Sequence, residues 1–305
     1  MVLLTLACLP PAARAADDPK LDIRPRFVTG EKFSLERQWS KKLIVDSVEQ
    51  SDISSSSVVQ VEIVDARPDR LLVRWTFGKP RFANRSYVKD LETLVLSQIL
   101  PDNALILEFG SAADQVKLKN FDQVKIRAER SRDRMVDTLK SASKATIARV
   151  KNAADARFED DQKLQETFAS EPRLFFSIFG RAYTSEPVPI GRRRSAKKDS
   201  ASGRTFKLKS WDKEKSTAEI SLVLDVDNAA LSESLRRTTI AAFQKAGRPL
   251  PPPEQMPTMN VSAEGTFVID TARSAVVSFE FHKDVKGQSF AGRREQLEVL
   301  RFVRK

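Results

Sequence analysis

Residues 266–282 read TFVIDTARSAVVSFEFH, and this stretch decides the fold class. Val, Phe and Ile are enriched in both of its halves, Thr266–Asp270 and Val276–His282, which is typical of β-strands. Thr271-Ala272-Arg273-Ser274, which follows the first half, predicts a tight hairpin turn. Because Phe279 and Phe281 alternate with polar residues, each strand is expected to have one buried and one solvated face.

The same alternation recurs on the N-terminal side of this hairpin. It is seen in five sets of alternating residues, mostly apolar: Phe33, Leu35, Arg37 and Trp39; Val59, Val61 and Ile63; Val73, Trp75 and Phe77; Phe206 and Leu208; and Ala218, Ile220, Leu222 and Leu224. Further strands are expected at 104–109 and 296–303, and either a strand or a helical turn at 91–100. Ser51–Ser57 is interpreted as a loop because it is rich in serine.

Two segments have a helical pattern instead. Residues 122–170 contain no Gly or Pro and have a thin apolar stripe, which predicts one or two long surface helices. A shorter helix is expected to begin after a cap at Asp227 or Asn228 and to end before Gly247. These patterns predict a β-dominated α+β fold: a curled antiparallel sheet of roughly nine to eleven strands with one long and one shorter helix.

The order of these segments predicts the domain organisation. We expect a signal peptide (1–15), a first β-rich lobe (16–121), a helical segment (122–186) and a second β-rich lobe with one helix (187–305). The two lobes are either related units or parts of one long curled sheet.

The beginning of the chain predicts export. Val2–Leu9 is apolar apart from one threonine, and Ala13-Arg14-Ala15 is a small-residue cleavage site, so cleavage is expected after Ala15 and the protein is expected to be periplasmic or secreted. No Lys or Arg precedes the apolar run, which a mis-assigned start codon would explain. The alternatives to a signal peptide are an ordinary buried segment and a lipoprotein anchor at Cys8.

Composition excludes several kinds of chemistry. Cys8 is the only cysteine, so a cleaved chain has no disulfide, thiolate nucleophile or Cys-ligated metal. His282 is the only histidine, and the sequence lacks G-x-S-x-G, H-E-x-x-H and Gly-rich phosphate-loop motifs. The acidic group at 155–161 is interpreted as helical ion pairing rather than as a hydrolytic or calcium site. We therefore expect no enzyme activity, no cofactor and no metal, and no apolar run after the signal is long enough to span a membrane.

The net charge of +11 is concentrated in one region. Arg192–Lys215 holds ten lysines and arginines against three acids. Because export separates the chain from nucleic acid, an anionic envelope component or an acidic protein is the expected partner. The candidate anion-binding residues are Arg192, Arg193, Arg194, Lys207 and Lys209, and the alternative is a solvated loop.

Aromatic residues supply the candidate ligand-binding set. Trp39 and Trp75 lie on apolar strand faces, and Leu174–Phe179 is the densest apolar cluster after the signal. The candidate residues are Trp39, Trp75, Phe175, Phe176 and Phe179, which bind an apolar ligand in one interpretation and form plain core in the other.

Three short motifs support a resemblance. They are Gly30–Phe33, Pro187–Gly191 and Glu264–Asp270. In this order the chain resembles exported bacterial β-rich proteins of a domain-of-unknown-function class and, more remotely, is similar to the periplasmic lipoprotein-carrier fold. The resemblance implies a hydrophobic concavity for a lipid chain. The expected function is therefore a non-enzymatic envelope protein that binds an apolar ligand; the alternative is a structural or interaction module with a filled core.

Overall fold

The computed structural model describes residues 20–83, 104–110, 116–138, 143–158, 160–190, 203–289 and 292–305. Within these ranges the strands are β1 (Leu21–Ile23), β2 (Lys32–Val45), β3 (Val48–Arg67), β4 (Arg70–Phe77), β5 (Arg81–Phe82), β6 (Ala104–Gly110), β7 (Val116–Leu118), β8 (Arg181–Tyr183), β9 (Val188–Ile190), β10 (Gly203–Asp212), β11 (Thr217–Asp225), β12 (Thr258–Asp270), β13 (Ala275–Ser289) and β14 (Gly292–Arg304). The helices are α2 (Phe121–Thr138), α3 (Lys144–Phe158), α4 (Asp161–Phe176) and α5 (Asn228–Lys245), and η1 (Pro253–Gln255) is a short 3₁₀ turn. The predicted signal peptide and the segment 91–100 lie outside the described residues.

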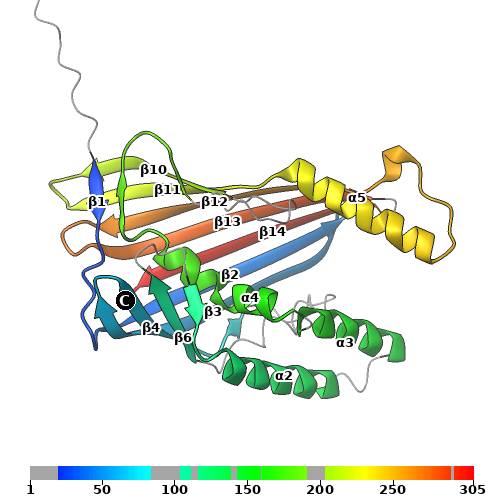
Figure 1. Ribbon diagram of the computed structural model, residues 1–305, viewed down its shortest axis with the longest axis horizontal. Helices are drawn as coiled ribbons and strands as arrows, with labels where there is room; N and C mark the ends of the chain where they lie inside the picture. The colour runs from blue at the N-terminus through cyan, green and yellow to red at the C-terminus, as the bar shows by residue number, and fades with distance from the viewer. Residues whose placement is uncertain are drawn as a thin grey trace, which may run out of the picture.

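Twelve of these strands form one antiparallel sheet in the order β7-β6-β4-β3-β2-β14-β13-β12-β11-β10-β9, with β5 paired to β3. β1 and β8 form a separate two-stranded sheet. In Figure 1 the long strands lie side by side and α4 is drawn in front of the sheet. Helix α5 lies beside the N-terminal end of β12. The predicted β-dominated α+β class is therefore confirmed, with one continuous large sheet. The predicted domain boundaries stay a prediction.

The last strand, β14, joins the two halves of the sheet. It pairs with β13 on one side and with β2 on the other, so that Leu300 lies between Phe281 and Trp39. Directly paired residues in antiparallel strands share a face of the sheet. We call the face that carries Phe281, Leu300 and Trp39 the inner face.

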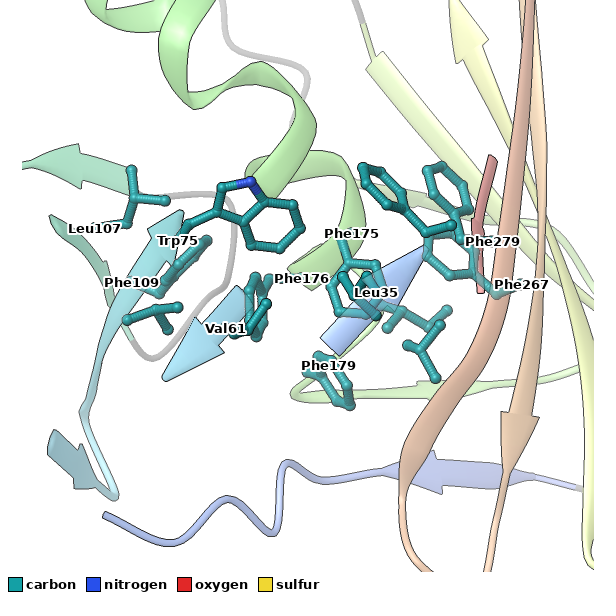
Figure 2. Close-up of a cluster of buried hydrophobic side chains, with 14 of the residues drawn as sticks. Leu35, Val61, Trp75, Leu107, Phe109, Phe175, Phe176, Phe179, Phe267 and Phe279 are labelled. Atoms are coloured by element: carbon teal, nitrogen blue, oxygen red, sulfur yellow. The ribbon is translucent and has the colours of Figure 1, made fainter. Parts of the chain in front are cut away.

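The core lies on the inner face around the end of α4. Trp75 is fully buried, and its ring centroid is 5.8 Å from that of Phe175 and 5.6 Å from that of Phe302. Phe176 contacts Phe109 at 4.8 Å between centroids. Figure 2 shows aromatic side chains from α4 and from the strands pointing towards one another. The alternating strand pattern is thus explained by one aromatic core against which one face of the sheet packs.

The helical predictions are largely confirmed. The segment 122–170 forms three helices rather than one or two, and the last begins at an Asp160 cap that accepts a hydrogen bond from the Lys163 backbone N–H at 3.0 Å. The shorter helix, α5, has the expected cap, because the Asp227 carboxylate accepts from the Ala230 N–H at 2.9 Å. Gly247 has a φ of 62°, the left-handed value that favours glycine after a helix.

The prediction of a loop at Ser51–Ser57 is wrong. These residues lie inside β3, and Ser51, Ser55 and Ser57 are buried on the inner face while their neighbours alternate outwards. The actual turn is at Asp46 and Ser47, which both have positive φ. The full ladder with β2 holds these serines in the strand, so tertiary pairing overrides their weak strand preference.

Candidate functional site

The predicted ligand-binding residues fall into two groups in the structure. Trp75, Phe175, Phe176 and Phe179 are all buried and in contact with other rings of the core. Trp39 packs against this core but is only half-buried, and its Nε1 donates a hydrogen bond to Glu298 Oε1 at 2.8 Å. Protein side chains therefore fill the space around the first group. The ligand-binding role of the whole set stays a prediction.

A polar bridge lies on the inner face beside this core. The Arg37 guanidinium donates two hydrogen bonds to the Glu171 carboxylate, of 2.8 and 2.6 Å, and so connects β2 with α4. Burial disfavours the charged form of Arg37, but the carboxylates of Glu171 and Glu298 hold its pKa above the usual value. Glu298 thus serves two partners on β2, as the acceptor for Trp39 and as a second negative charge near Arg37.

A cavity of about 730 Å³ lies further along the same strands, over β11, β12, β13 and β14. The side chains of its lining residues alternate between the two faces of the sheet, as they do along any strand. On the inner face it is lined by Leu224, Val261, Ala263, Lys283 and Glu298. Asn228, the first residue of α5, closes one side and binds the β12 backbone at Val261.

The lining residues on the two faces of the sheet differ in exposure. None of the five inner-face residues is exposed, whereas five of the eight lining residues on the opposite face are exposed, among them Val223 at 44% and His282. The inner-face wall is therefore the more shielded of the two, and we take it as the candidate ligand-binding wall and call its side of the cavity the inner-face cavity. The inner-face wall adjoins the buried core. Leu224, Ala263 and Lys283 lie two residues along their strands from Leu222, Gly265 and Phe281, and so on the same face.

A second cavity, of about 370 Å³, lies where the chain enters β2 and leaves β14. Its charged side chains already have partners: Arg304 pairs with Glu31 at 3.0 Å, and Lys305 pairs with Glu36 at 2.9 Å. Arg26 donates to the carbonyl of Ala272 at 3.1 Å. This cavity is less suited to an apolar ligand, since its entrance is covered by paired charges.

The predicted anion-binding residues are only partly described. Arg192, Arg193 and Arg194 lie outside the described residues. Lys207 is exposed on β10, on the face opposite to Phe206 and Leu208, and Lys209 is exposed at a β-bulge and pairs with Glu219 at 3.4 Å. The two lysines therefore lie away from the inner-face cavity, and their anion-binding role stays a prediction.

Three further candidate groups, His282, Asp155 and Asp161, have structural partners. His282 Nε2 lies 2.7 Å from Glu280 Oε1 on the outer face. Asp161 and Asp155 pair with Lys125 and Arg132 of α2. In the described ranges, no three His, Cys, Asp or Glu side chains converge as a metal site would require. None of the helices found there combines the length and apolarity needed to cross a bilayer.

Sequence reasoning missed the residues that line the cavity, although one signal was visible. Period two in Phe279, Phe281 and Lys283 places the lysine on the apolar face of its strand. A charged residue at an apolar position is the kind of exception that marks a site. The partners of this position on β12 and β14 depend on long-range pairing and have no local signature.

Comparison with known proteins identifies no relative. No protein family and no curated protein sequence matches the chain. Among solved structures, lipovitellin, described for its lipid–protein interactions, aligns with a TM-score of 0.46 and 7% identity over 92% of this chain. The chain spans 25% of that structure's length. An outer membrane channel from Pseudomonas putida F1 aligns with a TM-score of 0.18 and 5% identity over 93% of this chain and 98% of its own. Both scores are below 0.5, so neither likeness shows a shared fold.

Proposed function

We propose that this chain is an exported, non-catalytic binding protein that holds an acyl chain or another apolar ligand in the inner-face cavity. The observation that carries the proposal is the cavity of about 730 Å³, with Leu224, Val261 and Ala263 on its inner-face wall. Its volume falls in the range of roughly 300–1,000 Å³ that is usual for small-molecule sites. The export part of the proposal comes from the sequence at residues 2–15.

The position of the cavity supports an apolar rather than a polar ligand. It adjoins the row of Leu222, Gly265 and Phe281, of which all three members are buried. An apolar chain that enters the cavity would extend this contact with apolar side chains. Burial of apolar surface contributes about 25 cal/mol per Å², so a chain of some length can gain several kcal/mol there.

A second candidate function is an interaction module without a ligand. The filled aromatic core around Trp75 favours it, because that part of the inner face leaves no space for a ligand. The two functions predict different contents for the purified protein. They agree on the absence of catalysis, which stays part of the proposal.

Native mass spectrometry of the protein purified from an exporting host separates them. The spectrum is expected to show the chain cleaved after Ala15 with an additional mass that is released on denaturation, and solvent extraction then identifies that mass as a lipid. A cleaved chain with no additional mass, together with no binding of an added apolar probe, would overturn the proposal in favour of the interaction module. A chain that keeps residues 1–15 would overturn its export.

A further inference from the structure

Lys283 is a charged residue on the apolar side of its strand. It follows Phe281 by two residues and lies on the inner face between Ala263 of β12 and Glu298 of β14. Its side chain is half-buried and lines the cavity together with Leu224 and Val261. The aliphatic part of its side chain therefore lies at the apolar wall of the cavity.

The side chain of Lys283 has no hydrogen-bond or ion-pair partner in the described part of the chain. Its inner-face neighbour Glu298 accepts from Trp39 and contributes to the charge around Arg37, and no ion pair joins Glu298 to Lys283. The acids on either side of it in β13 point to the opposite face and have partners of their own: Glu280 binds His282, and Asp284 binds Lys286 at 2.7 Å. The charge of Lys283 is thus left for a group outside the chain.

A lysine ammonium without an ion-pair partner is available to an anion, which it holds by a charge-assisted hydrogen bond. The aliphatic stem of a lysine meanwhile packs well on apolar surface. A ligand that satisfies both parts of this wall needs an anionic head and an apolar chain. The net charge of +11 attracts such anions to the protein as a whole.

We propose that Lys283 binds the headgroup of an anionic single-chain amphiphile whose chain lies on Leu224, Val261 and Ala263. This inference rests on the proposed function and names its ligand class. A carboxylate and a phosphate monoester offer the same chemistry to the ammonium, since both supply anionic oxygen acceptors. A fatty acid and a phosphate-headed lipid are therefore the two sources to be distinguished.

The test compares three ligands of equal chain length, dodecanoic acid, dodecyl phosphate and uncharged dodecanol, by titration calorimetry on the full chain. Lys283→Gln removes the charge. Lys245→Gln is the matched control, since it removes an exposed lysine in the last turn of α5. Lys283→Arg keeps the charge and serves as the second variant if Lys283→Gln unfolds. We expect the protein to prefer one of the anionic ligands over dodecanol by about tenfold, the equivalent of one charge-assisted hydrogen bond.

The outcomes separate the inference from the function on which it rests. Loss of the anion preference in Lys283→Gln, with dodecanol still bound and the preference retained in Lys245→Gln and Lys283→Arg, supports the inference, and the more tightly bound anion names the headgroup. Dodecanol binding without any preference, or a preference that Lys283→Gln retains, overturns the inference and leaves the proposed function standing. No binding of any of the three ligands overturns the proposed function itself.

Discussion

Arg37 of β2 and Glu171 of α4 form a two-bonded ion pair with side chains only 12% and 16% exposed, although 134 residues separate them in the sequence. The pair lies on the inner face of the sheet, beside the aromatic core. It fixes the position of α4 relative to the central strands, and through Glu298 it is connected to the wall of the cavity.

Glu171→Gln is predicted to destabilise the protein strongly. It leaves the buried Arg37 charge without its principal partner, and breaking a buried pair in this way costs about 3–5 kcal/mol. Because Glu298 still stabilises the charge, we expect the free energy of unfolding in urea to fall by about 3 kcal/mol, the lower end of this range. Glu166→Gln, which changes an exposed acid on the same helix, is the control and should have little effect.

The double variant Arg37→Met/Glu171→Met removes both charges together. We expect it to lose less stability than the sum of the losses in the single variants Arg37→Met and Glu171→Met. Additive losses in this cycle would show that the two side chains do not interact in the folded protein.

Gly265→Ala is predicted to disturb the packing of Phe279 and Phe281 on the inner face. A Cβ at this position would lie 2.9 Å from Phe279 Cε2 and 3.0 Å from the backbone oxygen of Glu280. Such overpacking usually costs about 1–3 kcal/mol, measured as a loss in the free energy of unfolding. Gly287→Ala in β13 is the control, because its nearest contact would be an ordinary 3.5 Å, and it should change the stability by less than about 0.5 kcal/mol. Equal effects of the two substitutions would contradict this account of the packing.

The Asp160 cap of α4 gives the stability a component that depends on pH. The Lys163 backbone N–H holds the pKa of the Asp160 carboxyl below its usual 3.8. A lowered folded-state pKa means that the carboxylate stabilises the fold above pH 3.8 and that this contribution disappears as the pH falls through the lower folded value. The urea midpoints of the wild type and of Asp160→Ala should therefore differ at pH 7 and converge in acid.

Asp160→Asn is the control for this titration, since asparagine caps helices without ionising. Its urea midpoint should stay above that of Asp160→Ala throughout. A difference between the wild type and Asp160→Ala that persists unchanged to pH 2 would show that ionisation of this carboxyl does not contribute.

Local sequence patterns predicted much of the fold. Period two in Phe33, Leu35, Arg37 and Trp39 put all four residues on one face, and the structure confirms this. The pattern could not explain why an arginine stands among them, because its partner Glu171 is brought there by the packing of α4. The position of β14 between β2 and β13 could not be predicted from local patterns either, because it pairs Leu300 with Trp39, which is far away in the sequence.

The candidate site was harder to predict than the strands. Trp75 and the phenylalanines at the end of α4 are candidate ligand-binding residues in the sequence because they are strongly apolar. The same property buries them against one another in the core. The inner-face wall of the cavity is made of Leu224, Val261 and Ala263 on β11 and β12, with Lys283 on β13 and Glu298 on β14, and their convergence depends on register. Lys283 could be noticed from its position in the alternation, but its lack of a partner could not.

The most direct test of the account is binding of the uncharged fluorescent probe N-phenylnaphthylamine to two tryptophan variants. Leu224→Trp places a bulky ring in the inner-face cavity, whereas Val48→Trp places the same ring at a 58% exposed position of β3 that does not line this cavity. We predict that the wild type and Val48→Trp bind the probe equally and that Leu224→Trp, with an unchanged urea midpoint, binds it at least tenfold more weakly, a loss of about 1.4 kcal/mol. Equal binding by all three proteins, or no binding by the wild type, would contradict the claim that this cavity holds an apolar ligand.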